Sequence, residues 1–542
     1  MAALALSGTQ AAAARLSDTA RTYVEARAAA MSGNHARAAQ LLAALAGQQP
    51  DQADIAKKAL SEAIGAGDME LALRLARSVP AAKLPVDARL LLATEEIRRR
   101  HPERAATWLT QTGDNGDLTF LSPLISAWTA ADRGNESEAL NSFSAVSARS
   151  LLGPIESEQR AFLLLKFRRT ADADPFARQA VGRAGSRETR LRLAFADAFL
   201  AAGDKARALM IVEGMGPGEA AARVRINAGK NSGQAIDNLP KAISEVLTGF
   251  AADLARVQQA APPIGLVQVA RYANPQNSST TTLLALLLAG QDRSDEALAL
   301  LRAVPAGDTL MGQVRDVQVR ILRDEKKNDE AYRIAAAAAA GPDADVGDFS
   351  RLGDVYQSMK RHNEAADAYG KAVAFAQAQK LDGQLWSLLL LRASALEDAG
   401  RWPEARAALQ QALTLAPDQP LLLNFLGYAK LERGEDMDAA EAMIRKASDL
   451  APDEASITDS LGWAQFKRGK VDEAIATLQR AAEKDPAQAE IQEHLGDALY
   501  RSGRRFQARF AWNASLVTAE DDVQKRVKAK LASGLTPANA AP

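Results

Sequence analysis

Alanine recurs at a fixed spacing through the C-terminal half of this chain, and we call these positions the alanine ladder. Its members are Ala297, Ala331, Ala365, Ala405, Ala440, Ala474 and Ala508. Successive members are 34, 34, 40, 35, 34 and 34 residues apart. A period of this length indicates that one supersecondary unit is repeated, because such units bury their apolar faces only against their neighbours. The ladder therefore predicts a repeat architecture.

The residues around the ladder repeat with it. One unit has Leu-Gly at 461–462, then Ala474 and Pro486, and the next has Leu-Gly at 495–496, then Ala508. This pattern resembles that of tetratricopeptide (TPR) repeats. The glycine and the alanine are expected where two helices cross, since a larger side chain would separate their backbones. The resemblance implies an all-α TPR superhelical solenoid of antiparallel helix pairs, with roughly 12–14 repeats, interrupted near the middle.

The same phase continues more faintly through the N-terminal half. Ala38, Ala72, Ala105 and Ala139 are 34, 33 and 34 residues apart. Ala208 lies 69 residues after Ala139, which leaves room for one degenerate repeat around 150–185. Glycines and a proline break the pattern between about 214 and 262. The expected organisation is an N-terminal lead-in or signal-peptide remnant (1–20), a degenerate TPR-like segment (21–213), an irregular interruption (214–262), a TPR array (263–516), and a capping helix with a disordered tail (517–542).

Charge and hydropathy argue against nucleic acid and against a membrane span. The chain has 66 basic and 67 acidic residues, with a net charge of −1. Nucleic-acid binding needs a basic surface, and the composition offers no excess of cations. The apolar run 283–288 is much shorter than the roughly 20 residues that a transmembrane helix requires.

Motifs for catalysis, metal binding and cofactor binding are absent from the sequence. There is no cysteine, so no thiolate site and no lipid anchor on cysteine is expected. The four histidines lie at 35, 101, 362 and 494, too far apart for metal-ligand spacing. We therefore expect no enzyme activity, no metal and no cofactor. An alternative is an enzymatic site in the interruption, which offers Glu219, Asp237 and Glu245, with Glu213 at its edge.

The repeats also predict which side chains line a binding groove. Counted from Gly427, Gly462 and Gly496, three rows recur on the first helix of each pair. The rows are Asn424, Asp459 and Glu493, then Tyr428, Trp463 and Asp497, then Leu431, Phe466 and Tyr500. Because these rows face the groove in known TPR arrays, the resemblance implies a strip of aromatic, acidic and amide groups suited to a peptide or helix. Packing of Tyr428 and Trp463 in the core is the alternative.

Residues 401–516 resemble one group of TPR proteins more closely. The segments 424–428, 459–463, 494–497 and 508–512 are similar to proteobacterial TPR proteins of the cell envelope. That group includes adaptors that hold a carboxyl-terminal processing protease and supply it with cell-wall hydrolases. The resemblance implies a non-enzymatic, protein-binding scaffold in the periplasm or envelope. The adaptors are tethered through a lipidated cysteine, which this chain lacks.

The first fourteen residues bear on location. They are alanine-rich and apolar, and they resemble the end of a signal peptide with a cleavage site before Arg15. A positively charged start is missing, so this stretch is either a signal remnant or an alanine-rich lead-in. A cytoplasmic assembly scaffold with the same repeats is the alternative to an exported one.

Overall fold

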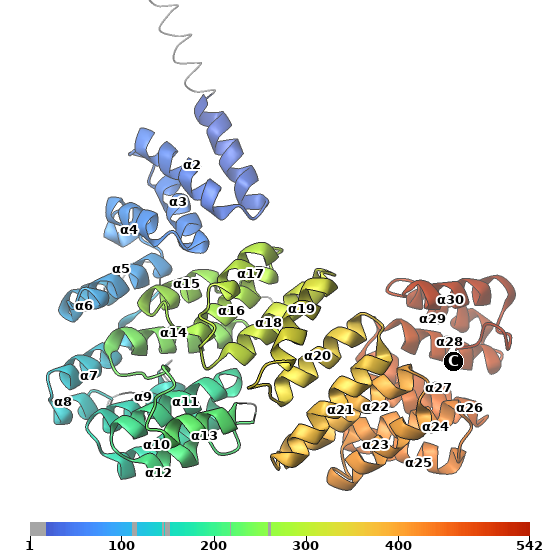
Figure 1. Cartoon of the computed structure of the whole chain (residues 1–542). Coiled ribbons are helices and arrows are strands. Elements are labelled where there is room, and N and C mark those ends of the chain that lie inside the picture. Colours follow the sequence, from blue (N-terminus) through green and yellow to red (C-terminus); the bar gives the residue numbers. More distant parts are fainter. Residues whose placement is uncertain are drawn as a thin grey trace, which may run out of the picture. The chain divides into compact units, whose positions relative to one another are not determined.

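The computed structural model describes residues 18–110, 116–143, 146, 152–216, 218–257 and 262–541. Helices joined by short turns make up these ranges, which contain no β-strand, and Figure 1 shows their arrangement. The chain forms two compact units, Met1–Gly347 and Asp348–Pro542. The prediction of an all-α chain built from antiparallel helix pairs is confirmed.

In the first unit, residues 18–31 are helical and precede the labelled helices. Those helices are α2 (His35–Gln48), α3 (Ala53–Ala66), α4 (Met69–Ser78), η1 (Ala81–Lys83), α5 (Val86–Arg98), α6 (Pro102–Leu109), η2 (Thr119–Leu121), α7 (Ser122–Asp132), α8 (Glu136–Asn141), α9 (Gly153–Lys166), α10 (Thr170–Arg183), η3 (Gly185–Arg187), α11 (Glu188–Ala201), α12 (Lys205–Ile211), α13 (Glu219–Asn227), α14 (Leu239–Leu254), α15 (Ile264–Ala273), α16 (Ser278–Ala289), α17 (Ser294–Arg302), α18 (Met311–Asp324) and α19 (Asn328–Ala339).

The second unit begins within α20 and ends with α30. Its helices are α20 (Val346–Ser358), α21 (His362–Ala378), α22 (Asp382–Asp398), α23 (Trp402–Leu415), α24 (Pro420–Glu432), α25 (Met437–Leu450), α26 (Ala455–Lys467), α27 (Val471–Lys484), α28 (Ala489–Arg501), α29 (Arg505–Ser515) and α30 (Asp521–Ser533). Each even-numbered helix from α20 to α28 is the first of a pair. The 40-residue step in the ladder arises because α21 and α22 have 17 residues each, whereas α26 and α27 have 13 and 14.

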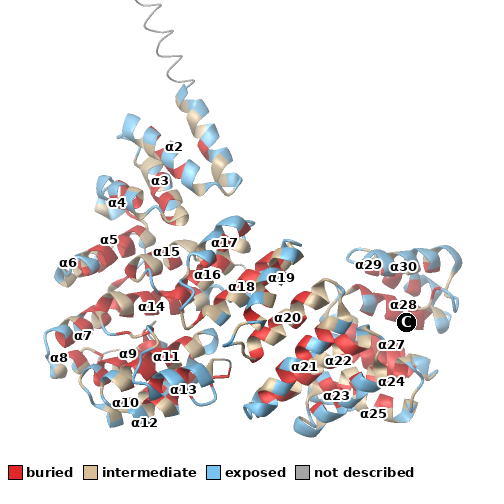
Figure 2. Cartoon of the chain, viewed as in Figure 1, coloured by how far each residue is buried: buried red, intermediate tan, exposed pale blue. Residues whose placement is uncertain are grey.

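The alanine ladder lies at the crossings of the helix pairs. All seven members and the four N-terminal alanines at 38, 72, 105 and 139 have no exposed surface (Figure 2 maps burial along the chain). The glycines of the first helices lie equally close to the second helices. A Cβ atom added to Gly462 would lie 2.6 Å from Cγ of Leu478, and one added to Gly427 would lie 2.7 Å from Cγ1 of Ile444. Small residues at these positions let the two backbones approach each other.

The turn inside each pair explains why the sequence pattern fades in places. The residue five positions before most ladder alanines has a positive φ, for example +76° at Gly469, whereas before Ala440 the positive φ values lie at Gly434 and Asp436. Lys360 and Arg168 adopt the same conformation, with φ of +57° and +60°. Non-glycine residues can adopt this conformation at a cost of about 1 kcal/mol. Where they do, the sequence lacks the glycine that otherwise marks the turn. Arg168 precedes the fully buried Ala173, which is the ladder position between Ala139 and Ala208.

The first unit folds back on itself. Helix α15 packs against α3 and α5, and α14 packs against α5 and α7. The hydroxyl of Tyr272 donates to Oε2 of Glu95 at 2.6 Å, across 177 residues of sequence. Burial and then this hydrogen bond raise the pKa of Tyr272 to about 12. Repeats of a simple solenoid contact only their neighbours, so this packing is an addition to the predicted architecture.

The described residues of the segment 214–262 form two helices, α13 and α14. Most residues of α14, including Ser244, Glu245 and Thr248, are buried. Because α14 is enclosed on several sides, its apolar residues do not follow the one-faced period of a repeat helix. The sequence places its irregular interruption here, whereas the structure divides the chain into compact units after Gly347.

Candidate protein-binding face

The three predicted rows lie on α24, α26 and α28, and most of their side chains are covered. Leu431, Asp459, Trp463, Glu493 and Asp497 are buried. Asn424, Tyr428, Phe466 and Tyr500 are half-buried. The sequence implies an open strip of these nine side chains. In the structure, other parts of the same unit cover much of it.

Helix α30 covers the end of the strip on α28. Nζ of Lys530 lies 2.7 Å from Oε1 of Glu493 and 2.7 Å from Oδ2 of Asp497, and all three side chains have essentially no exposed surface. Arg526 adds a second cation on Glu493, at 2.9 Å. Burial opposes ionisation of Glu493, but hydrogen bonds from Arg526 and Lys530 outweigh it and lower its pKa. Burial raises the pKa of Asp497 despite Lys530. Helix α30 is thus held over this end of the strip by buried ion pairs.

A stacked group of rings occupies the middle of the strip. Trp463 lies between His494 and Phe466, with ring centroids 4.1 Å and 4.8 Å away and nearly parallel planes. Nδ1 of His494 lies 2.9 Å from Oδ2 of Asp459. Burial favours the neutral ring, but the Asp459 carboxylate outweighs burial and raises the pKa of His494. For Trp463 the structure thus agrees with the alternative of core packing.

The C-terminal segment reaches the same strip. The backbone N–H of Ala541 donates to Oδ2 of Asp497 at 3.2 Å. Ala541 is buried in one apolar cluster with Leu431, Leu461 and Trp463. Figure 1 places this end of the chain beside α28. The sequence predicts a disordered tail after the cap, but residues 537–539 form a turn and Asn539 is buried.

On α24, one polar atom of the strip lacks a hydrogen-bond partner. Oδ1 of Asn424 is buried and accepts no hydrogen bond from any described residue. Tyr428 lies one turn further along α24, and burial, followed by the carboxylates of Glu432 and Asp459, raises its pKa. Buried acceptors without a donor are uncommon in native structures, because each costs about 1–3 kcal/mol. Because this oxygen has no exposed surface, a bound molecule can donate to it only after the side chains that cover it move aside.

Sequence reasoning missed the partners that cover the rows. His494 and Lys530 were not among the predicted residues, yet they neutralise Asp459, Glu493 and Asp497. The spacing holds a usable signal, since His494 lies 35 residues after Asp459 and Lys530 lies 33 residues after Asp497. Residues one repeat apart on first helices are neighbours in a TPR array, so opposite charges at this spacing suggest pairing.

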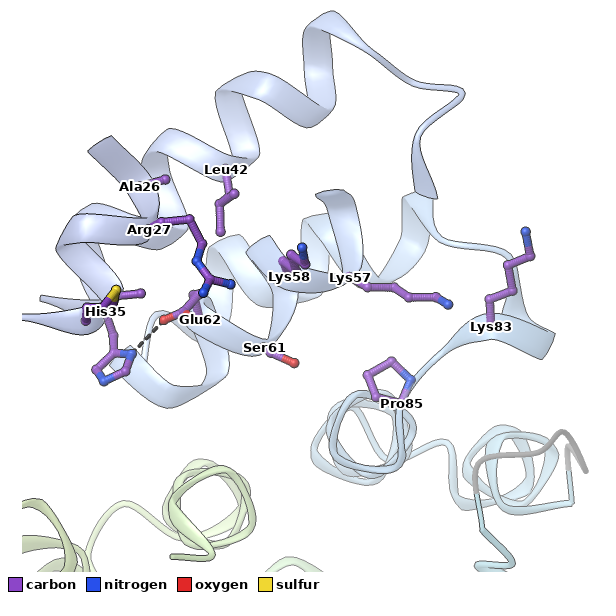
Figure 3. A pocket seen from close by; sticks show the side chains of 12 residues that line it. Ala26, Arg27, His35, Leu42, Lys57, Lys58, Ser61, Glu62, Lys83 and Pro85 are labelled. Carbon is purple, nitrogen blue, oxygen red and sulfur yellow. Dashed lines mark hydrogen bonds and ion pairs between the residues drawn. The ribbon is translucent and has the colours of Figure 1, made fainter. Parts of the chain in front are cut away.

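A separate hollow of about 560 Å³ lies in the first unit between residues 26–42, α3 and residues 83–85 (Figure 3). Arg27, Lys57, Lys58 and Lys83 line it, and Nδ1 of His35 lies 2.6 Å from Oε2 of Glu62. The charged side chains of the lining are therefore mainly basic, which suits an acidic molecule better than a basic one. None of these residues was predicted, because they are contributed by several helices without a repeating spacing.

The carboxylates of the 214–262 segment have structural partners. Glu245 lies 2.9 Å from Arg187, which also pairs with the buried Glu158 at 3.1 Å. Burial raises the pKa of Glu158, although the Arg187 cation opposes this. Glu219 accepts from the backbone of Gly214. The described residues contain no group of three or more His, Asp or Glu side chains that could hold a metal ion. No helix in the described ranges is sufficiently long and apolar to cross a membrane.

Comparison with known proteins identifies repeats in the second unit. Residues 462–503 match a model described as TPR repeat, and residues 385–431 and 349–379 match models described as tetratricopeptide repeat. No curated protein matches the chain. Tetratricopeptide repeats are therefore present between residues 349 and 503, in agreement with the predicted spacing.

Several solved structures resemble the chain at low identity. A chain of the APC/C hetero-tetramer Cut9-Hcn1 is 15% identical over 96% of this chain and 96% of its own, with a TM-score of 0.39. A tetratricopeptide repeat protein from Parabacteroides merdae is 15% identical over 46% of this chain and 96% of its own, with a TM-score of 0.37. YrrB, a TPR protein with an unusual peptide-binding site, is 16% identical over 36% of this chain and 97% of its own, with a TM-score of 0.27.

Proposed function

We propose that this chain is a non-enzymatic scaffold that binds an extended protein segment on the face of α24, α26 and α28. The TPR repeats support a protein-interaction scaffold. The unpartnered Oδ1 of Asn424, beside the half-buried Tyr428, supports the choice of this face. Once the side chains over Asn424 move aside, a backbone N–H of a bound segment would satisfy its oxygen, and the ring of Tyr428 would cover the segment's side chains.

The test compares two asparagine variants. Asn424→Ala removes the buried acceptor, while Asn513→Ala removes an exposed amide on α29 that bonds only locally to Arg509. Each variant and the wild type are used in a crosslinking capture from bacterial envelope extracts, with quantitative mass spectrometry. We expect Asn424→Ala to reduce the bound partner about tenfold without lowering thermal stability, as the loss of one hydrogen bond predicts. Equal capture by both variants would remove this face from the proposal.

We further propose that the scaffold works in the bacterial periplasm or envelope and presents clients to a carboxyl-terminal processing protease or a cell-wall hydrolase. The similarity of the segments at 424–428 and 459–463 to envelope TPR proteins supports this. Binding two proteins on one rigid array would raise their effective concentration. Residues 1–14, which lie outside the described residues, would act as the end of an export signal. The mass of the native N-terminus tests this, since an uncleaved chain in the cytoplasm contradicts it.

A further inference from the structure

The segment 534–541 lies across the proposed binding face in a defined conformation. It leaves α30 at Gly534, whose φ of +81° only glycine adopts readily. A Cβ atom at this position would collide with the hydroxyl of Tyr500, so Gly534 lies against the hydroxyl end of that side chain. At the other end, Ala541 donates to Asp497 and packs in the cluster that contains Trp463. The segment therefore runs from Tyr500 at one end to Asp497 and Trp463 at the other, all three of which are predicted row residues.

A side chain within the segment holds this conformation. Oδ1 of Asn539 accepts from the backbone N–H of Thr536 at 2.7 Å, and its Nδ2 donates to the carbonyl of Gly534 at 2.9 Å. The amide of Ala540 donates to the carbonyl of Thr536 at 3.0 Å. Asn539 is buried, although the neighbouring residues 536–538 are exposed. The turn thus directs Ala541 inward rather than into solvent.

The chemistry of the segment resembles that of a bound peptide. Residues 534–541 read Gly-Leu-Thr-Pro-Ala-Asn-Ala-Ala and contain no charged side chain. The acidic groups beneath it already have cations, since Lys530 pairs with both Glu493 and Asp497. Ala541 occupies two further positions, one acceptor position on Asp497 and a place in the apolar cluster beside Trp463. An amide N–H and a methyl group fill both.

We propose that residues 534–541 are an internal ligand of this face. The partner that the face accepts is then an extended, uncharged segment of small residues, which must displace residues 534–541 to bind. This inference rests on the proposed function, because it assumes that the face of α24, α26 and α28 is the binding site. The internal ligand lowers the apparent affinity for every partner, since a tethered segment competes at high effective concentration.

The experiment measures binding of a fluorescein-labelled peptide with the sequence of residues 534–542 by fluorescence anisotropy. Four chains are compared: the wild type, a chain shortened to end at Ser533, Ala541→Glu and Ala538→Glu. Ala541→Glu places a charged side chain in the apolar cluster that contains Trp463 and should expel the segment without removing α30. Ala538→Glu adds the same charge at an exposed position and is the matched control.

We expect the shortened chain and Ala541→Glu to bind the peptide at least tenfold more tightly than the wild type and Ala538→Glu. Equal affinity for all four chains would overturn the inference. Absence of binding to both released chains, with unchanged thermal unfolding, would overturn it as well. If the shortened chain does not fold, Ala541→Glu against Ala538→Glu decides the result. The proposed function has a separate test. If the peptide binds all four chains equally but partner capture is still reduced by Asn424→Ala, the inference fails and the proposed function stands.

Discussion

At the scale of single residues, the repeat is specified by a few small side chains at helix crossings. Ala474 and Gly462 are both buried in the crossing of α26 and α27, so both are packing positions. The neighbouring rows do two things at once. Trp463 packs as core, whereas Asn424 and Tyr428 keep part of their surface open. The identity of a row therefore does not determine whether its members are available to a partner.

Gly462→Ala tests the crossing. The new Cβ would lie 2.6 Å from Cγ of the fully buried Leu478, so α26 or α27 must shift. We expect a loss of about 1–3 kcal/mol in the free energy of unfolding, measured by urea denaturation. Gly47→Ala in α2 is the control, because its Cβ would have no neighbour within 4 Å. The control should be neutral or slightly stabilising, since alanine favours a helix over glycine. A neutral Gly462→Ala would contradict the close crossing.

His494 predicts a pH dependence. Its pKa is raised in the fold above the ordinary 6.5 by Asp459, aided by Asp497 and Glu493. A raised pKa means that the ion pair contributes its full stability below about 6.5 and loses it as pH rises through the folded-state pKa. We expect the melting temperature of the wild type to fall in one step as the pH rises through the folded-state pKa of His494. His494→Gln should lack the step, and a variant that keeps it would show that another group titrates.

At the scale of the element, α30 combines a cap with a buried charge network. Val523 and Val527 cover the apolar surface of the last pair, as the sequence predicts for a cap. Lys530 adds ion pairs that the apolar pattern does not reveal. The cap is consequently fixed in one orientation, which also sets the point from which residues 534–541 reach the binding face.

Lys530→Met tests whether the buried ion pairs hold α30 in place. It leaves Asp497 without a cation and Glu493 with Arg526 alone, both in a buried site. Breaking a buried pair costs about 3–5 kcal/mol, so we expect a loss of that size in unfolding free energy. Lys528→Met removes an exposed lysine two residues earlier, on the other side of α30, that bonds Gln524. Its effect should stay within about 0.5 kcal/mol. Similar values for the two variants would show that α30 does not depend on the buried pairs.

At the scale of the whole molecule, large apolar clusters of described residues lie within each of the two units. The first unit's large cluster runs from Ala26 to Leu310. The clusters around Trp463 and Trp512 contain only residues of the second unit. The first unit closes through contacts between α15 and α3 or α5, while the second consists of successive helix pairs. The difference in packing suggests different unfolding behaviour.

We expect residues 341–542, which retain all of α20, to fold alone. A unit with its own core needs no contact from elsewhere to become stable. Circular dichroism should give a helical spectrum with cooperative unfolding, and hydrogen exchange should protect α24 to α28 as in the full chain. An unfolded fragment would show that the second unit depends on the first. Residues 1–347 provide the complementary sample.

The sequence alone determined the repeat. Its period identifies helix pairs because crossings accept only small residues, and those positions, such as Ala474 and Gly462, are confirmed as buried. Tertiary structure decided what the rows do. Pairing of Asp459 with His494, and of Asp497 with Lys530 and Ala541, depends on which neighbour covers each helix. A local period records which face a side chain occupies, but it cannot record what a cap, or a chain that folds back, places on that face.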